Sequence, residues 1–414
     1  MKKLSKFLGV SVFLLTLLYT LLFIFLDYKA HGEITYTFFV AMLCLCGVYF
    51  LGILIFYLCN HKKRDIIQVV EFESPDGLTP ADVGYIIDAN VDDKDVSALL
   101  VFWAGKKYLS IEDKGEDALI KKLKDSDDSM KSYEKTLFNA IFSAGEEVLV
   151  SNLPDILKNQ APTASREIQL ENDEKYFNIP ARDLSKSIMT SSSFLLGILT
   201  FFFTSSNSAS EYWFIPLLIL IGLSANFSSI ANKMYVQNRK QAFGQYFGGI
   251  AVFLLIAVWN IFLCEPIMEI YILLGVASFV CLFSYILCPL MEMRNKEGRK
   301  MLGRILGLKK YIELAEKDKM DVLVKEDPKL FYKVLPYAYV LNVSDEWIEK
   351  LNFVKEINKN QKTKNAVATV AVASIVMNKT TKSVKGLMKG SVIAVLFLNA
   401  IANAKSGNIR KLKK

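Results

Sequence analysis

Six long runs of almost uncharged, mostly apolar residues stand out along the chain. They occupy 7–26, 36–58, 188–206, 212–231, 247–264 and 268–290. Each has roughly the 18 to 23 residues that a helix, rising about 1.5 Å per residue, needs to cross ~30 Å of hydrocarbon. Each Leu, Ile, Phe or Val in such a run favours insertion by roughly 0.3 to 0.6 kcal/mol. The pattern therefore predicts a mainly α-helical membrane protein with six transmembrane helices, since a soluble protein would need six such core helices by coincidence.

Lysine and arginine concentrate in alternate connections between these runs. They lie before the first run, after the second, between the fourth and fifth, and after the sixth: Lys2, Lys3 and Lys6; Lys62, Lys63 and Arg64; Lys233, Arg239 and Lys240; Arg294, Lys296, Arg299 and Lys300. Basic loops stay on the cytoplasmic side. We therefore expect a multi-pass plasma-membrane protein with both termini and residues 61–187 in the cytoplasm. The first run also has the basic start of a signal peptide, but its length and the absence of a small-residue cleavage site favour a retained anchor.

The polar segment between the second and third runs has the pattern of an α+β domain. The predicted elements are a β-rich lead-in at 66–72, helices at 80–88 and 93–104, strands at 108–111 and 118–123, a helix at 132–142, a strand at 147–150 and a helix from 152 to about 176. Thr79 before Pro80, and Asp92, have the chemistry of helix starts. Two helices followed by a hairpin are typical of a winged helix, here inserted between spans two and three.

Charge divides the chain into segments of opposite sign. Residues 61–187 have a net charge of −8, and residues 291–414 have a net charge of +14. The helix at 93–104 offers one lysine and begins with aspartates, whereas DNA binding needs basic residues to neutralise phosphates. A protein-contact module is therefore favoured over nucleic-acid binding. The predicted domains are 1–60, 61–187, 188–290, 291–356 and 357–414.

Catalytic and cofactor chemistry have little support in the sequence. The two histidines, His31 and His61, leave almost no material for histidine-based triads or metal sites. There is no glycine-rich phosphate loop and no G-x-S-x-G or H-E-x-x-H motif. The acids near Asp92 lack the spacing of a calcium loop. The six cysteines all lie in or beside the apolar runs, as expected in a reducing compartment. We therefore expect no enzyme, no cofactor and no metal.

The segment after the sixth run predicts more helices. Residues 297–319 place Met301, Ile305, Leu308, Ile312 and Ala315 on one face of an amphipathic helix. The sequence LPY at 335–337 kinks a following helix, and Ser344 is suited to cap the next one, with Trp347 in its core.

Five stretches resemble a known family, the YciQ-like predicted membrane proteins, also called the domain of unknown function 2207 family. They are GLTPADVGYIIDANVDDKD (77–95), KKYLSIED (106–113), YEKTLFNAIF (133–142), GLKKYIELAEK (307–317) and LPYAYVLNVSDEW (335–347). The resemblance implies a microbial envelope protein with a cytoplasmic winged-helix-like region and no established activity. Members often start with a secreted β-rich domain and end in a glycine-rich tail, whereas this tail is rich in lysine.

The tail contains no acid after Glu356, yet it carries 12 Lys+Arg. Drawn as a helix, it sets apolar side chains opposite four lysines: Lys379, Lys382, Lys385 and Lys389. We expect these lysines to contact anionic lipid from a basic amphipathic helix, at roughly 1 kcal/mol each before crowding. Two other readings stay open, a disordered basic tail and a tail that docks on the acidic segment 61–187.

These observations favour a membrane-anchored scaffold or regulatory protein whose acidic cytoplasmic domain binds an unknown protein partner. The alternative is a small-solute transporter or channel formed by the six spans, although the spans offer few charged residues at mid-membrane depth. A nucleic-acid binder acting through the tail is less favoured.

Overall fold

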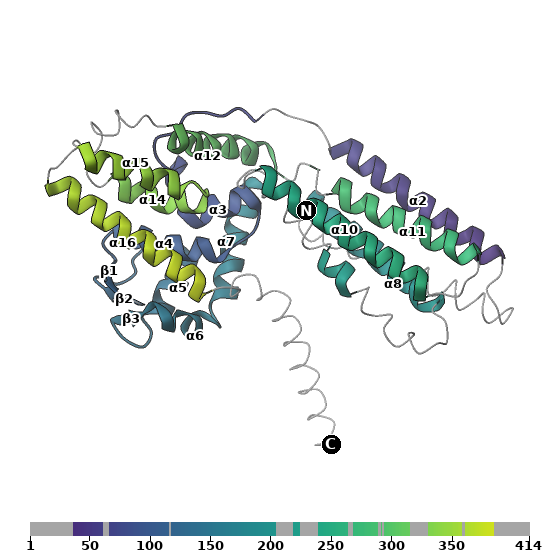
Figure 1. Cartoon of the computed structure of the whole chain (residues 1–414), viewed down its shortest axis with the longest axis horizontal. Coiled ribbons are helices and arrows are strands. Elements are labelled where there is room, and N and C mark those ends of the chain that lie inside the picture. The colour runs from purple at the N-terminus through teal and green to yellow at the C-terminus, as the bar shows by residue number, and fades with distance from the viewer. Residues whose placement is uncertain are drawn as a thin grey trace, which may run out of the picture. The chain divides into compact units, whose positions relative to one another are not determined.

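The computed structural model describes residues 36–60, 66–115, 117–203, 218–223, 239–263, 268–288, 291, 294–314, 330–357 and 361–384. The described chain is mainly helical and has one small sheet (Figure 1). It divides into two compact units. Unit 1 comprises Met1–Asp65 and Phe177–Lys296, and unit 2 comprises Ile66–Tyr176 and Glu297–Lys414. The chain therefore passes between the units three times.

Unit 1 contains the long apolar helices. They are α2 (Tyr36–Asn60), α8 (Ile179–Phe203), α10 (Arg239–Leu263) and α11 (Met268–Leu287). Three described segments are long and apolar enough to cross a membrane: Tyr36–Cys59, Gly244–Phe262 and Met268–Leu287. They confirm the predicted runs at 36–58, 247–264 and 268–290 as candidate spans.

The other three predicted runs have a different outcome. The run at 188–206 falls largely within α8, but that helix starts well before the run and carries Arg182, Asp183 and Lys186 near its beginning. It is not among the three candidate spans found in the described residues. The run at 7–26 and most of the run at 212–231 lie outside the described residues.

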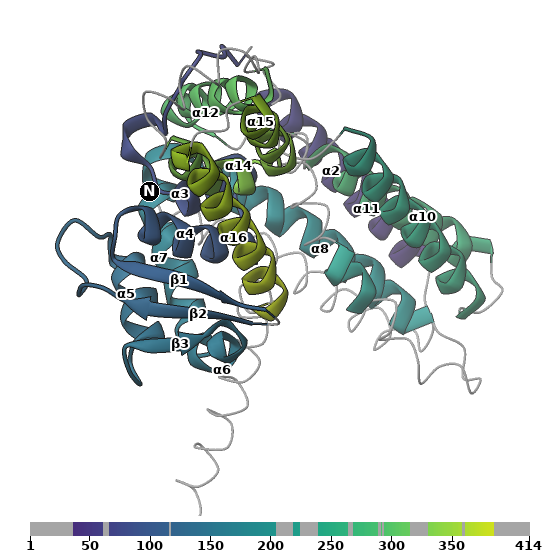
Figure 2. The same cartoon turned by 60° about the vertical axis from the view of Figure 1, so that its left-hand side comes forward.

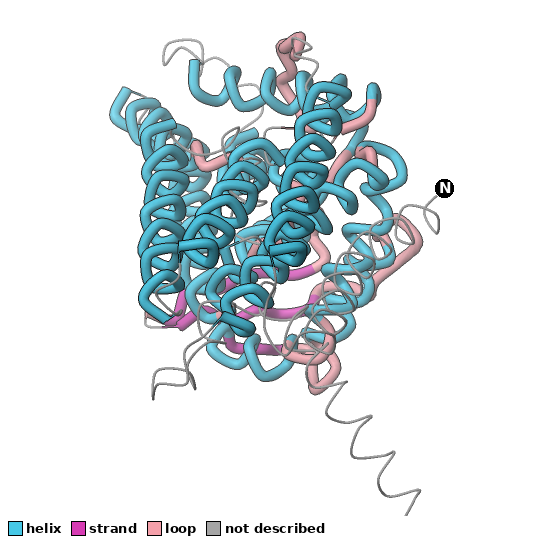
Figure 3. The backbone as a smooth tube through the Cα atoms, turned by 90° about the vertical axis from the view of Figure 1, so that its right-hand side faces the viewer, coloured by secondary structure: helices cyan, strands magenta, loops and turns pink. Residues whose placement is uncertain are grey.

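Unit 2 joins the acidic segment to the segment that follows the last apolar run. Its helices are α3 (Pro80–Asp88), α4 (Asp93–Gly105), α5 (Ser132–Ile141), α6 (Leu153–Leu157), α7 (Ala161–Tyr176), α12 (Lys296–Leu314), α14 (Leu330–Val340), α15 (Ser344–Ile357) and α16 (Gln361–Ser383). Its strands are β1 (Leu109–Lys114), β2 (Asp117–Lys122) and β3 (Glu147–Leu149). They form one antiparallel sheet in the order β1-β2-β3 (Figure 2), and Figure 3 shows its strands in magenta side by side.

The first two helices of unit 2 start where the capping residues predict. The Thr79 hydroxyl accepts a hydrogen bond from the Asp82 N–H at 3.2 Å, and the Asp82 carboxylate accepts one from the Thr79 N–H at 2.9 Å. At α4, the Asp92 N–H donates to the Asp95 carboxylate at 2.6 Å. The reciprocal pair at α3 and the single bond at α4 satisfy N–H groups that a helix start leaves unpaired.

The helix α4 lies at the centre of unit 2. It packs against α3 and β1 from the acidic segment and against α14 and α16 from the C-terminal segment (Figure 2). Its apolar side chains are almost completely buried, with Leu99, Leu100 and Trp103 each 0% exposed. The two segments thus share one hydrophobic core, although 120 residues, 177–296, separate them in sequence.

The lead-in at 66–72 is extended, but it joins no strand of the sheet. It runs along α12 instead (Figures 1 and 2). A Cβ atom added to Gly303 would lie 2.1 Å from the Ile67 carbonyl oxygen, and one added to Gly307 would lie 1.6 Å from that of Val69. Only glycine allows the backbone of 66–72 to approach α12 so closely. The lead-in therefore packs against this helix and not against a neighbouring strand.

The helix predicted from 152 to 176 is divided into α6 and α7. Pro162 stands at the second position of α7 and has no N–H to bond to the carbonyl four residues earlier. A continuous helix would lose that bond, whereas the first turn of a new helix tolerates proline.

The two oppositely charged segments of the chain fold together within unit 2. Residues 66–176 carry 12 Lys+Arg and 23 Asp+Glu, while residues 297–414 carry 24 and 11. Arg304 bridges Glu71 at 2.6 Å and Asp76 at 2.7 Å, and Lys379 approaches Asp113 at 3.2 Å. Among the described residues, ion pairs therefore join the acidic segment to the basic one within unit 2.

Candidate functional site

A cavity of about 410 Å³ opens in unit 2 where the two chain segments meet. We call it the α4–α14 pocket. It is lined by Glu73, Ser74 and Gly77, by Val101, Phe102, Gly105 and Lys106 at the end of α4, by Leu308 of α12, and by Lys333, Val334, Pro336 and Tyr337 of α14. Mostly apolar walls with a few polar groups at the rim are characteristic of ligand sites.

Two aromatic rings form adjoining walls of the α4–α14 pocket. The Phe102 and Tyr337 rings meet edge to face with their centroids 6.2 Å apart. The Lys106 ammonium lies 4.3 Å from the Phe102 centroid, so a cation stands over the face of this ring at the rim. This wall combines apolar contact area with a positive charge, a combination that suits an apolar group flanked by an acid.

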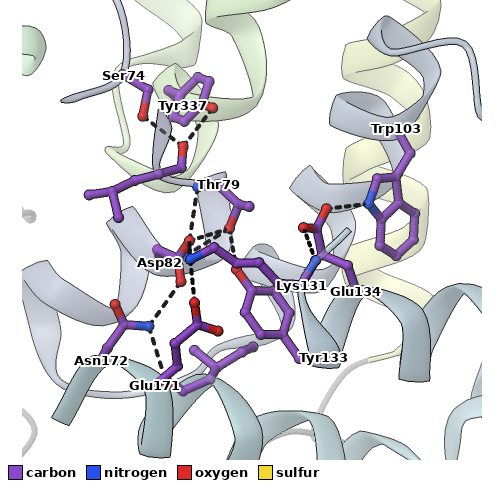
Figure 4. Close-up of polar contacts among 12 residues, drawn as sticks. Ser74, Thr79, Asp82, Trp103, Lys131, Tyr133, Glu134, Glu171, Asn172 and Tyr337 are labelled. Atoms are coloured by element: carbon purple, nitrogen blue, oxygen red, sulfur yellow. Dashed lines mark hydrogen bonds and ion pairs between the residues drawn. The ribbon is translucent and has the colours of Figure 1, made fainter. Parts of the chain in front are cut away.

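The Leu78 carbonyl oxygen holds two pocket residues in place. It accepts hydrogen bonds from the Ser74 hydroxyl at 2.7 Å and from the Tyr337 hydroxyl at 2.8 Å (Figure 4). Burial raises the pKa of Tyr337, which therefore remains a neutral donor. These bonds tie α14, from the C-terminal segment, to the start of α3.

A buried polar network built around Asp82 lies beneath this contact (Figure 4). The Asp82 side chain is 0% exposed. Its carboxylate accepts hydrogen bonds from the Thr79 N–H and hydroxyl, each at 2.9 Å, and from the Asn172 amide at 2.9 Å. The Lys131 ammonium lies 2.9 Å away, and the Tyr133 and Thr79 hydroxyls are 2.6 Å apart. Because a buried carboxylate is stable only when it is paired and hydrogen-bonded, this network holds α3, α5 and α7 together.

Lys131 and Glu134 extend the network toward α4. Burial alone would lower the pKa of Lys131, but the neighbouring Asp82 and Glu171 carboxylates raise it overall. Burial raises the pKa of Glu134, although the Lys131 N–H and the Trp103 indole N–H, at 3.0 Å and 2.8 Å, favour its charged form. Trp103 in the core of α4 is therefore linked through hydrogen bonds and the Lys131 side chain to Asp82 under the pocket.

Asp95 of α4 is a buried acid that makes stability depend on pH. Its side chain lies against Gly84, and burial followed by repulsion from Asp88 and Asp92 raises its pKa well above 3.8. The folded state therefore holds this proton more tightly than the unfolded state. As pH rises from about 3.8 through the raised pKa, the free energy of unfolding must fall, by about 1.4 kcal/mol for each pH unit of that interval.

We expect Asp95→Asn to flatten this pH dependence. The amide oxygen can still accept the Asp92 N–H, but no buried charge forms. The free energy of unfolding of the variant, measured in urea between pH 4 and pH 8, should equal that of the wild type at the acid end and exceed it at the neutral end. Parallel curves for the two proteins would contradict this expectation.

The four tail lysines predicted to contact lipid lie partly within unit 2. The Lys379 ammonium donates to the Asp117 carbonyl at 3.1 Å and lies at 3.2 Å from Asp113, and it also donates to the Gly115 carbonyl in the β1–β2 turn. Lys382 is exposed at the end of α16. Lys385 and Lys389 lie outside the described residues. The described part of the tail thus packs on the acidic segment, which was one of the readings that the sequence left open.

Hydroxyl groups join the helices of unit 1. The Ser192 and Ser284 hydroxyls are 2.9 Å apart, those of Ser193 and Tyr285 are 2.5 Å apart, and Tyr49 of α2 bonds to Ser191 of α8. Small hydroxyl residues of this kind allow close helix packing in a membrane and bond across the interface.

Sequence reasoning identified the walls of the α4–α14 pocket only as parts of separate helices. Phe102 falls within the helix predicted at 93–104, and Tyr337 within the predicted kink at 335–337. No local pattern relates residues 73–77 to residues 333–337, because the contact depends on tertiary packing. Among the described residues, no group of three or more His, Cys, Asp or Glu could hold a metal ion.

The model of a protein family, described as the C-terminal domain of predicted membrane proteins (DUF2207), matches residues 69–240 and 227–351. The matched residues include the pocket, the Asp82 network and the candidate spans α10 and α11. No curated protein and no solved structure matches the chain.

Proposed function

Since the chain belongs to the DUF2207 family of predicted membrane proteins, we propose that it is a membrane-anchored scaffold or regulatory protein. In this proposal unit 2 lies in the cytoplasm and binds another protein through the α4–α14 pocket, while unit 1 holds it at the plasma membrane. The protein performs no catalysis of its own. The alternating basic connections support the cytoplasmic placement of unit 2 and of both termini.

The α4–α14 pocket is the observation that carries this proposal. Aromatic anchors in well-packed, water-excluding pockets contribute most of the energy of protein–protein binding. Phe102 and Tyr337 offer such a surface, and the hydrogen bonds to the Leu78 carbonyl keep the Tyr337 ring in place without a ligand. A partner would place an apolar side chain in the pocket against both rings and an acid near Lys106.

The order of α3, α4, β1 and β2 supports a winged-helix-like assignment for this part of unit 2. In nucleic-acid-binding domains of this type, one helix lies in the major groove. Here α4 packs between α3, α14 and α16, and Lys94 is the one basic residue within it. This helix is therefore unsuited to a phosphate backbone, which favours a protein partner over DNA.

The pocket predicts a site-specific crosslink in the full-length protein. A benzophenone amino acid that replaces Phe102 should form an adduct with one protein partner in cells. The same amino acid in place of Leu170, which is 53% exposed on α7, should not. Phe102→Ala should reduce the copurified partner at least tenfold, and Leu170→Ala should leave it unchanged. Equal adducts at the two positions, or adducts with lipid alone at position 102, would contradict the proposal.

A further inference from the structure

The extended segment along α12 exposes an unusual run of apolar side chains. Ile67, Val69, Val70 and Phe72 are 78%, 50%, 65% and 63% exposed. We call these four residues the apolar strip. Elsewhere in the described part of unit 2, large exposed apolar residues are scattered singly, as is normal for a protein surface. Contiguous exposed apolar residues instead mark a surface that meets a partner.

The backbone under the apolar strip is held firmly. The carbonyl oxygens of Ile67 and Val69 approach Gly303 and Gly307 of α12 so closely that no side chain fits there. Arg304, between the two glycines, bridges Glu71 and Asp76. The segment thus presents its apolar side chains from a fixed backbone and does not bury them in its own unit.

The covalent chain limits the distance between the apolar strip and the end of α2. Ile67 follows Asn60, the last residue of α2, by seven positions, so it lies within about 25 Å of the end of that candidate span. The helix α12, on which the strip lies, begins only nine residues after α11 ends. Near its start, Gly298 packs closely on the Tyr176 carbonyl, where the chain returns to unit 1. Ile67, Val69 and Tyr176, near the ends of the segments of unit 2, thus all contact α12.

Basic and aromatic residues accompany the apolar strip in sequence and on α12, and the acids Glu71 and Asp76 beside it are paired with Arg304. Lys62, Lys63 and Arg64 lie in the connection between α2 and the strip, and Lys300 is exposed on α12. The Phe72 ring packs edge-on against Tyr311 with the centroids 5.0 Å apart. Aromatic residues beside lysine and arginine are favoured at headgroup depth, where the rings meet acyl chains and the cations meet anionic lipids.

We propose that the apolar strip lies in the headgroup region of the leaflet from which α2 emerges and docks unit 2 on the bilayer surface. The occupant of this surface is lipid. The short tether, the adjacent basic residues and the rigid backbone together favour lipid over a protein partner. This inference is independent of the α4–α14 pocket, which draws on different residues.

Fluorescence quenching in the full-length protein tests the docking. The native cysteines are replaced by alanine, and a single cysteine is introduced as Val70→Cys or, as the control, Leu170→Cys. Both positions are exposed, at 65% and 53%. Each variant is labelled with bimane and reconstituted in nanodiscs that contain 70% phosphatidylcholine and 30% phosphatidylglycerol. Nitroxide-labelled lipid and aqueous iodide serve as the two quenchers.

Nitroxide lipid should quench the label at position 70 at least threefold more than the label at position 170. Iodide should quench the label at position 170 more than the label at position 70. Lowering the phosphatidylglycerol content to zero should weaken the lipid quenching at position 70. Equal lipid quenching at the two positions would overturn the proposal. So would protection of position 70 from both quenchers, because protein would then cover the strip.

Discussion

Gly307→Ala is expected to lower the free energy of unfolding of unit 2 by about 3 kcal/mol. The added Cβ would lie 1.6 Å from the Val69 carbonyl oxygen, and that oxygen is backbone, so no side-chain rotation can relieve the clash. The segment under the apolar strip must move away from α12, and the contacts of Arg304 with Glu71 and Asp76 are then lost as well.

Tryptophan fluorescence in urea can measure this change. Trp103 and Trp347 are both fully buried in unit 2, so replacing Trp213 and Trp259 of unit 1 by phenylalanine isolates the signal. Lys310→Ala on the exposed face of the same helix is the matched control and should leave the midpoint unchanged. Glutamyl endopeptidase should cleave after Glu71 faster in Gly307→Ala. Wild-type stability together with wild-type cleavage would show that the segment does not depend on α12.

Asp82→Ala is the second change with a large expected effect. It removes the buried one of the two carboxylates that pair with the Lys131 ammonium, leaving Glu171 at 2.7 Å, and it removes the acceptor of Thr79 and Asn172. Breaking a buried ion pair from one side costs about 3 to 5 kcal/mol, because the remaining charged and polar groups stay desolvated. The network lies directly below the Leu78 contact with Tyr337. Crosslinking of the partner to a benzophenone at position 102 should therefore fall together with the free energy of unfolding.

Two further variants separate charge from packing in this network. Asp82→Asn keeps the size of the side chain and one acceptor oxygen, so it should lower the free energy of unfolding less than Asp82→Ala does. Asp125→Ala removes a carboxylate that pairs with Lys122 at 2.8 Å on the surface, and it should leave the urea midpoint unchanged. An equal decrease of the urea midpoint in Asp82→Ala and Asp125→Ala would show that the buried hydrogen bonds and ion pair of Asp82 do not stabilise unit 2.

Local sequence was sufficient wherever an element depends on its own residues. Thr79 with Pro80 starts α3 and Asp92 starts α4, as predicted, while Ser344, predicted as the cap of α15, is its first residue. The apolar face predicted for the helix after the last run is buried at Met301, Ile305, Leu308 and Ile312. Capping bonds and helical periodicity act over only a few residues, so they can be read directly from the chain.

Local sequence misled where a distant partner decides the outcome. The β-branched lead-in at 66–72 has the composition of a strand, yet α12 takes the place of a neighbouring strand. Gly303 and Gly307 were the available signal, because two glycines one helical turn apart allow a backbone to approach. Nothing in either segment identifies the other as its partner.

The sequence by itself determined the membrane character of the protein and the type and limits of most of its helices. Uncharged length and capping chemistry are properties of single segments, and they act whatever the rest of the chain does. Only the tertiary structure decided that the acidic and basic segments form one unit, that Lys379 binds a hairpin turn, and that Phe102 and Tyr337 enclose a pocket. These outcomes depend on side-chain packing between residues more than 200 positions apart, for which no local pattern exists.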